Sequence, residues 1–456
     1  MRPYREYTTD QAALLPPSFA DLIPQDDPVF FMREIVGQLD LSAFHDVYRS
    51  ERGRPPFHPA LMVGLYFYGA ARRTYSSRRL AEACARDVSF IYLVGRATPD
   101  HHTISEFRQR FSKELKALFV QVLLLCQEAG LVRLGHISLD GTKLRANASR
   151  HKAMSYGRMV LKEPELAAEV ERLLGEGQRQ DAKDDAAHGP NDDGWSMPAE
   201  LRETNRRLEK IRAGKQRLQE QVREKALEKG KDPAEAVVPD RAQTNFTDPE
   251  SRIMNTTEGF QQCYNAQAAV DATSHVIVAC EVSNAPPDVQ RLRPMLKQVH
   301  DNTGHFPNAL TADAGYASEA NFTALAEADV YAVIALRRYH RDEPPDADPA
   351  AKGSSGHWPH RNVMRDRLST VEGKQIYKLR KQTVEPVFGQ IKSARGFRQF
   401  LRRGLPAVTA EWSLLCTVHN LLKLFSATAL PAERTERPPR RANNSHATVE
   451  QLSFAG

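Results

Sequence analysis

Three acidic residues occupy positions from which a carboxylate can take part in chemistry. Asp140 ends the short run His136–Asp140, and Asp313 ends a second run, Ala309–Asp313. Both runs are typical of strands, and a carboxylate at a strand end is held by the sheet while the next loop exposes it. Glu385 lies in an amphipathic helical segment. Singly, each has an ordinary explanation, because aspartates are common in turns and a lone glutamate on a basic helix usually faces water.

The segment 378–404 places Glu385 at the edge of a packed helix face. Its apolar residues recur at the i, i+3, i+4, i+7 spacing of a helix that buries one side: Val384, Val387, Phe388 and Ile391. At roughly 100° per residue, three positions share the side of Glu385: Lys381, Gly389 and Lys392. Glycine has no side chain, so this side admits close approach by a large partner. We therefore expect the carboxylate to point into a basic strip.

The surroundings of Glu385 are strongly basic. Between Arg361 and Arg403 the chain has twelve Lys or Arg residues against three Asp or Glu residues. Such a run is typical of a surface that binds a polyanion. Four aromatic residues interleave with these cations: Tyr377, Phe388, Phe397 and Phe400. They could stack on exposed bases or belong to the core, and the sequence leaves both alternatives open.

Composition narrows the class of protein. The 456 residues are too many for one ordinary core and predict two or three domains. The net charge of +6 and the isoelectric point of about 9.0 favour nucleic acid over a small acidic molecule as partner. Five cysteines without a CxxC pair indicate a reducing cytoplasm and argue against a cysteine zinc site. No stretch resembles a signal peptide, and the apolar runs are too short to cross a bilayer, so a soluble cytoplasmic protein is expected.

The first 132 residues are predicted to be mainly helical after a proline-rich, extended lead-in over 1–30. The expected helices are 30–39, 59–73, 78–86 and 104–129. The last of these begins at a capping-box pattern formed by Thr103 and Glu106. The second and third, separated by a tight polar break, form either a helix-turn-helix that reads DNA or a simple packing unit.

Residues 150–250 differ from the rest of the chain. Gly175–Gly194 is strongly polar and predicts a flexible loop. After it, apolar residues recur at steps of seven, three, seven and four along a charged helix: Leu201, Leu208, Ile211, Leu218 and Val222. This narrow stripe is typical of an antiparallel helical hairpin or a short coiled coil. We interpret the segment as an inserted helical arm that serves dimerisation, DNA contact or neither.

Strands and helices alternate in the remainder of the chain. The predicted elements are a β-hairpin from 264–271 and 275–282, a strand at 330–336, and helices at 289–300 and 318–328. Together with the strands that carry Asp140 and Asp313, this order predicts a mixed α+β domain whose helices flank a sheet. His357 and His360 lack a third metal ligand nearby, so they indicate an exposed loop. The Pro- and Arg-rich end of the chain predicts a disordered tail.

This order of blocks resembles the bacterial insertion-sequence transposases of the DDE type. The resemblance covers roughly residues 57–424 and is carried by PFHPALMVGLYFYG, LDGTKLRANAS, YNAQAAVD, LTADAGYAS and YKLRKQTVEPVFGQIKSARGFRQFLRRG. The two aspartates and the glutamate that give that family its name correspond here to Asp140, Asp313 and Glu385.

Many relatives in that family carry a tyrosine, arginine, glutamate and lysine signature along the last catalytic helix. Tyr377, Arg380, Glu385 and Lys392 resemble it. The gap from Arg380 to Glu385 is one residue longer than in the commonest form of the signature, whereas Lys381 lies at the usual distance. Either Arg380 or Lys381 therefore takes the part of the arginine.

The resemblance implies a fold and a division into domains. The catalytic domain would be RNase H-like, with a five-stranded mixed sheet and flanking helices, interrupted by a helical insertion. The expected division is a lead-in at 1–30, a helical DNA-binding or assembly domain at 31–132, the catalytic domain at 133–149 and 251–425, the inserted arm at 150–250, and a disordered tail at 426–456.

The resemblance also implies a function. The chain would be a DNA transposase that binds the ends of its element and catalyses metal-dependent strand cleavage and strand transfer. Asp140, Asp313 and Glu385 would hold Mg²⁺, for which Mn²⁺ can substitute. The implied partners are double-stranded DNA, as terminal inverted repeats and as target, and further copies of the chain, in the bacterial cytoplasm at the nucleoid. DNA contacts are expected from Tyr377, Arg380, Lys381, Lys392, Arg395 and Arg398.

Two alternatives stay open. The chain could be a catalytically silent DNA-binding protein derived from a transposase, or a Mg²⁺-dependent nuclease that does not join strands.

Overall fold

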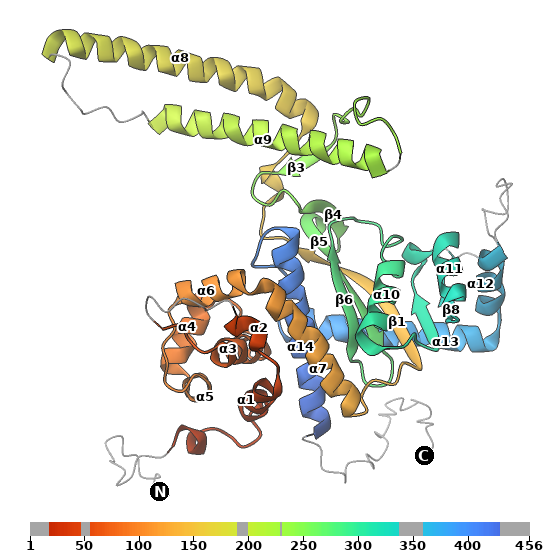
Figure 1. The fold of residues 1–456 in the computed structure, drawn as a ribbon. Helices are drawn as coiled ribbons and strands as arrows, with labels where there is room; N and C mark the ends of the chain where they lie inside the picture. Colours follow the sequence, from red (N-terminus) through yellow and green to blue (C-terminus); the bar gives the residue numbers. More distant parts are fainter. Residues whose placement is uncertain (1–17, 47–54, 189–198, 229, 337–358, 429–456) are drawn as a thin grey trace, which may run out of the picture.

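The protein is organised around two long helices, α7 (Ser112–Glu128) and α14 (Leu405–Thr428), which lie side by side. The computed structural model describes residues 18–46, 55–188, 199–228, 230–336 and 359–428. N-terminal helices lie on one side of the α7/α14 pair and a mixed sheet on the other, while a helical hairpin projects away from both (Figure 1). No helix within the described ranges is long and apolar enough to span a membrane.

The N-terminal part is helical, as predicted. Its elements are η1 (Phe19–Leu22), α1 (Pro28–Gln38), α2 (Ser42–His45), α3 (Pro59–Ala71), α4 (Ser77–Arg86), α5 (Val88–Leu93) and α6 (His101–Arg110). Helix α3 is the centre of the group, because every residue from Met62 to Ala70 is buried. A helix that is apolar on all sides is expected only where other helices surround it.

The helix expected over 104–129 is in fact two helices, and the capping-box prediction was wrong. Asp100 is the N-cap: its Oδ1 accepts hydrogen bonds from the amides of His102 and Thr103 at 2.8 and 3.0 Å. An aspartate three residues earlier competes well for this role, since it combines a strong acceptor with a negative charge at the helix N-terminus. Phe111, which is fully buried, leaves helical geometry and separates α6 from α7.

Strand β1 (His136–Arg145) is the central strand of a six-stranded mixed sheet. The other strands are β4 (Arg252–Thr256), β5 (Gly259–Asp271), β6 (Ile277–Ser283), β7 (Ala309–Ala312) and β8 (Tyr331–Ile334). Their order is β4-β5-β1-β7-β8, with β6 also paired to β5. The predicted hairpin and the strands near 309 and 330 are confirmed. The sixth strand, β4, was not expected, because its short sequence RIMNT becomes a strand by pairing with the first residues of β5.

Helices flank this sheet. They are α10 (Leu292–Thr303), α11 (Glu319–Glu327), α12 (Pro359–Ser369) and α13 (Val371–Gly389), and a π-helical turn at Gln390–Ala394 continues α13. Helix α13 contacts β1, β5, β7 and β8. Its predicted apolar face is confirmed, because Val384, Val387, Phe388 and Ile391 are all buried.

A continuous hydrophobic core joins the helical part to the sheet through α14. Trp412 of α14 is fully buried and donates its indole N–H to the carbonyl of Gln267 on β5 at 3.0 Å. Phe388, Phe397 and Phe400 belong to the same core. Three of the four aromatic residues that could have stacked on bases are therefore packing residues.

The insertion is a helical hairpin, as predicted. Helix α8 (Tyr156–His188) packs against α9 (Ala199–Glu228), and the short strands β2 (Ala153–Ser155) and β3 (Gln243–Asn245) pair at its base. Residues 175–188, expected to be a loop, continue α8; residues 189–198 lie outside the described ranges. Polar composition does not prevent helix formation here, because ion pairs such as Arg172 with Glu169 and Glu176 lie one turn apart.

Helical structure extends further toward both ends of the chain than the sequence predicted. The lead-in expected over 1–30 contains η1 and the start of α1, and residues 1–17 lie outside the described ranges. The tail expected over 426–456 is helical at 426–428, because α14 continues to Thr428, and residues 429–456 lie outside the described ranges. His360 lies in α12, and His357 is outside the described ranges.

Helix α14 also binds the edge of the sheet and the end of α13 through buried polar side chains. Asn420 accepts from the amide of Ile277 and donates to its carbonyl, both at 2.8 Å, and so acts as a strand partner for β6. His419 accepts from Arg395 at 2.9 Å and contacts the carbonyl of His275 at 2.9 Å. Burial and the positive charge of Arg395 lower the pKa of His419 to about 3. The imidazole is therefore neutral at physiological pH.

Replacing Asn420 with alanine is expected to destabilise the protein by roughly 2 to 4 kcal/mol, because two buried backbone groups of Ile277 lose their partners. Urea unfolding monitored by circular dichroism measures the change. Asn255→Ala is the matched control, since Asn255 is exposed. Equal stability of the two variants would contradict the role given to Asn420.

Because His419 is buried as a neutral imidazole, we expect the protein to lose stability in acid. Its pKa is about 3 in the folded protein, well below the ordinary value of 6.5. The unfolded chain therefore binds the proton more tightly, and the free energy of unfolding falls as the pH drops below 6.5. Between pH 7 and pH 5 the stability of the wild type relative to His419→Gln should decrease by about 2 kcal/mol. Urea titrations at both pH values test this. A difference between the two proteins that does not change with pH would refute the buried neutral imidazole.

Candidate active site

Strand pairing brings Asp140 and Asp313 together. Strand β1 pairs with β7 in parallel only as far as Leu139, which lies opposite Ala312. The next residue on each strand is one of the two aspartates, so both carboxylates lie at the point where the strands separate. Asp140 was expected at the end of its strand. It lies instead in the middle of β1, which continues to Arg145 because its other edge stays paired with β5.

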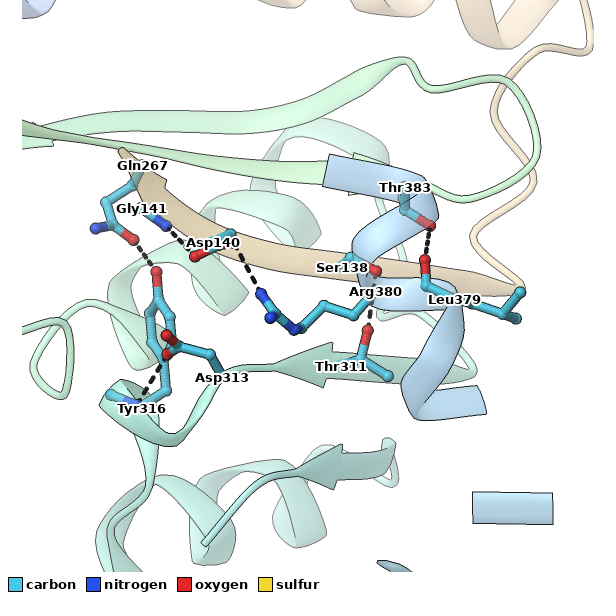
Figure 2. A network of polar contacts seen from close by, with 11 residues as sticks. Ser138, Asp140, Gly141, Gln267, Thr311, Asp313, Tyr316, Leu379, Arg380 and Thr383 are labelled. Carbon is cyan, nitrogen blue, oxygen red and sulfur yellow. Dashed lines mark hydrogen bonds and ion pairs between the residues drawn. The ribbon is translucent and has the colours of Figure 1, made fainter. Parts of the chain in front are cut away.

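The Asp140 carboxylate is largely buried and has two partners. Its Oδ1 accepts from the amide of Gly141 at 2.8 Å, and its Oδ2 accepts from Nη1 of Arg380 on α13 at 2.8 Å (Figure 2). Burial raises the pKa of Asp140 to about 6 despite the opposing effect of Arg380, and repulsion from Asp313 and Asp288 contributes to the increase. Negative charge is thus concentrated here beyond what one arginine neutralises.

Asp313 caps the short η3 turn (Ala314–Tyr316) that follows β7. Its Oδ1 accepts from the amide of Gly315 at 2.8 Å. The turn directs Tyr316 into the core, where its hydroxyl donates to Oε1 of Gln267 on β5 (Figure 2). Burial and the nearby carboxylates Asp288, Asp140 and Asp313 raise the pKa of Tyr316 well above its usual value. Tyr316 therefore remains a neutral donor beside the acidic group.

Asp288 is a third carboxylate of this site, and it was not among the residues predicted from the sequence. It follows β6 in the segment Asn284–Asp288, directly before the helix predicted over 289–300. In the fold its Oδ1 accepts from Nδ2 of Asn265 and from Nε2 of Gln267, both at 2.7 Å. A local pattern could not find it, because its partners lie on β5, about twenty residues earlier.

Two glycines make room for these carboxylates. A Cβ on Gly141 would lie 2.3 Å from Nε2 of Gln267 and 2.8 Å from Oδ1 of Asp288. A Cβ on Gly315 would lie 2.9 Å from Oδ1 of Asp313 and 3.3 Å from Oδ2 of Asp288. Contacts this short force neighbouring atoms to move, so any side chain at either position would displace the acidic groups.

Glu385 lies on α13 but on a different side from Arg380. The two residues are five apart, so they point roughly 140° apart around the helix axis. Glu385 is exposed, and within the described ranges no group of three His, Cys, Asp or Glu side chains is close enough together to hold a metal ion. The structure thus brings together two of the three expected carboxylates, with Asp288 in addition.

The helix around Glu385 is irregular. Pro386 has no amide N–H, so the carbonyl of Gln382 loses the partner it would have in a regular helix. Nε2 of His275 lies 3.1 Å from that carbonyl and takes the place of the missing amide. The π-helical turn follows directly after α13. Glu385 is therefore carried by a segment whose backbone ladder is already interrupted on both sides.

The predicted DNA-contacting residues fall into three groups. Tyr377 and Arg380 line the acidic site: the Arg380 guanidinium lies 5.8 Å from the Tyr377 ring centre, and burial raises the pKa of Tyr377, as do the charges of Asp313 and Asp140. Lys381 and Arg398 are exposed. The last group consists of Lys392 and Arg395, whose side chains are held inside the protein.

Lys392 and Arg395 have internal partners. Nζ of Lys392 donates to the carbonyl of Lys143 on β1 at 3.0 Å, which fixes the end of α13 against the central strand. Arg395 is 7% exposed and bound to His419, as described above. A side chain that is buried and bonded in this way is not placed to contact DNA.

The donor chemistry of the site suits a hard divalent cation. The acidic neighbours of Asp140 are the carboxylates of Asp313 and Asp288. Carboxylate oxygens are the donors that Mg²⁺ and Mn²⁺ prefer. The raised pKa of Asp140, caused by burial and by its acidic neighbours, is what a cation at this position would relieve.

Comparison with known families identifies two separate parts of the chain. Residues 17–110 match the family described as Transposase domain (DUF772), and residues 238–421 match Transposase DDE domain. The second match contains Asp288, Asp313 and Glu385, whereas Asp140 lies between the two matches and joins the site through the pairing of β1. No curated protein and no solved structure gave a significant match.

The two matches account for the architecture. A helical N-terminal part precedes a mixed sheet with flanking helices, which confirms the expected RNase H-like α+β fold. The matched domains also make this a DNA transposase. The chain belongs to the DDE-type insertion-sequence transposases.

Proposed function

We propose that this transposase cleaves DNA at the ends of its element and joins the freed strand to target DNA in a single site built on Asp140, Asp313 and Glu385. The observation that carries the proposal is the placement of Asp140 and Asp313 side by side where β1 and β7 separate. Two carboxylates fixed by adjacent strands are a rigid base for cation binding.

The chemistry requires charge stabilisation on both sides of the scissile phosphate. Divalent cations held by carboxylates supply it by activating the attacking oxygen and stabilising the leaving oxygen. Asp140 and Asp313 are close enough for their charges to interact, and Tyr316 nearby stays neutral because burial and these carboxylates raise its pKa. Glu385 on α13 would be the third carboxylate that holds the cations. The interruption of the helix ladder at Pro386 supports a movement of Glu385 toward the aspartates when DNA and cation are present.

Arg380 has two successive partners in this proposal. Without DNA or cation, it neutralises Asp140 at 2.8 Å. A cation held by Asp140 would take over that neutralisation, and the guanidinium could then bind two oxygens of a phosphate in a bidentate manner. Lys381 on α13 and Arg398 after it are both exposed, and they would extend the positive surface that contacts the DNA backbone.

The other partners follow from the same proposal. The N-terminal helices and the exposed Arg78 and Arg79 of α4 contribute to binding of the terminal inverted repeats. Both element ends must meet at one target, so the active form is an assembly of several copies on DNA. The division of the chain into an N-terminal binding domain, a catalytic domain and an inserted arm remains part of this proposal.

The proposal predicts that three single substitutions abolish chemistry but not DNA binding. With labelled element ends, a target plasmid and Mg²⁺ or Mn²⁺, the wild type should cleave and join. Asp140→Ala, Asp313→Ala and Glu385→Ala should each reduce cleavage by roughly 1000-fold or more. Gel separation of cleaved and joined products measures both steps.

Controls separate this function from its alternatives. Glu372→Ala on the exposed start of α13 and Asp301→Ala on α10 should behave like the wild type. Full activity in any of the three site variants removes that residue from the site. Cleavage without joining by the wild type would identify a nuclease, and end binding without cleavage would identify a silent DNA-binding protein.

A further inference from the structure

The proposed reaction uses the carboxylates of Asp140, Asp313 and Glu385, and it assigns no role to Asp288. It lies beside Gly141, the neighbour of Asp140, and beside Gly315, two residues after Asp313. Its charge acts on Asp140, whose pKa it helps to raise. Asp288 is therefore an electrostatic neighbour of both aspartates, although it comes from a different connection of the sheet.

A buried hydrogen-bond chain fixes the Asp288 carboxylate. The neutral Tyr316 hydroxyl donates to Oε1 of Gln267, so the other end of that amide, Nε2, must donate to Asp288. Asn265 donates to the same oxygen, Oδ1. Asn265 and Gln267 are at most 1% exposed, so the chain has little freedom to rearrange. Both amides hold Oδ1, and Oδ2 is directed toward Gly315 and the Asp313 side.

Ion pairs among the described residues balance only part of the charge of this group. Within the described ranges, three carboxylates (Asp140, Asp313 and Asp288) have one ion-pair partner, Arg380, which binds Asp140. The nearest arginine along the chain, Arg291, pairs with Glu281 instead. Like charges brought together in a partly buried site cost folding energy unless a cation relieves them.

We propose that Asp288 is a positioning residue for the divalent cation of the proposed active site. It adds a fixed negative charge that attracts the cation to Asp140 and Asp313, and its Oδ2 is available to orient the cation's hydration shell. A role through water agrees with the absence, within the described ranges, of a three-ligand group close enough to bind a metal directly. Mg²⁺ commonly keeps several waters in protein sites. This inference rests on the proposed function above.

The ordinary alternative is that Asp288 only braces Asn265 and Gln267 at the start of the connection to α10. The two roles differ in what they require. Bracing needs an acceptor at Oδ1, which asparagine also supplies. Attraction of a cation needs the negative charge, which asparagine lacks. Asp288→Asn therefore separates the two roles with little change of shape.

The test is Mn²⁺ binding to the metal-free, full-length protein, measured by isothermal titration calorimetry in the absence of DNA. Asp288→Asn should weaken Mn²⁺ binding by about tenfold or more, as loss of outer-shell partners does at metal sites. The melting temperature of the metal-free variant should be unchanged or higher, since repulsion is removed. Asp301→Asn on α10 is the matched control and should bind as the wild type does.

Two further variants test charge and position separately. Asp288→Glu keeps the charge and should lose less affinity than Asp288→Asn. Asn265→Ala keeps the charge but removes one of the two hydrogen bonds that fix it, so it should also weaken Mn²⁺ binding. This variant decides the question if Asp288→Asn does not fold. Wild-type affinity in Asp288→Asn, or in Asn265→Ala when the former is unfolded, would overturn the inference.

The same titrations distinguish this inference from the proposed function. If Asp140→Ala and Asp313→Ala bind Mn²⁺ as tightly as the wild type, the proposed metal site is wrong and Asp288 has nothing to position. If those two variants lose binding while Asp288→Asn retains it, the active site stands and only the role of Asp288 is overturned. Saturating Mn²⁺ should restore much of the cleavage lost in Asp288→Asn.

Discussion

Strand β1 is hydrogen-bonded along both edges, but only one of the two pairings lasts for its whole length. The antiparallel pairing with β5 continues to Arg145, whereas the parallel pairing with β7 ends at Leu139. At that point β7 ends and the chain turns into η3, whereas β1 continues along β5. The gap created there holds Asp140 and Asp313. The remaining features of the site depend on this single difference in length.

Helix α13 determines which charges reach the gap. It lies across β1, β5, β7 and β8 with its apolar face buried, so the residues at the edge of that face point along the sheet surface. Arg380 reaches Asp140 from this edge, and Lys392 binds the β1 backbone three residues farther along. The helix thereby supplies the positive charge that the clustered carboxylates require, and it carries Glu385 on its exposed side.

Helix α14 connects these elements to the rest of the molecule. It packs between α7 and the sheet, donates from Trp412 to β5, and pairs through Asn420 with the backbone of β6. The helical N-terminal part and the sheet consequently share one hydrophobic core. DNA bound by the N-terminal helices would therefore be held in a fixed relation to the carboxylates on β1 and β7.

Much of this architecture could be predicted from local pattern. Apolar spacing located α3, α9 and α13, and short apolar runs located β5, β6, β7 and β8, because helix and strand periodicities are properties of consecutive residues. The N-cap of α6 was mispredicted because two capping candidates lie three residues apart. The polar half of α8 was mispredicted as a loop because ion pairs between helical turns replace apolar packing there. Strand β4 forms because it pairs with β5, and its own five residues show little of the alternation that predicts a strand.

The residues of the candidate active site divide in the same way. The sequence by itself determined that Asp140, Asp313 and Glu385 are the acidic residues to consider, since their strand and helix settings are local and resemble a known family. Only the tertiary structure decided that Asp288 stands beside the first two, that Arg380 and not Lys381 pairs with Asp140, and that Arg395 is buried against His419. Each of these depends on contacts between segments distant in the chain, which register and packing establish and local spacing cannot encode.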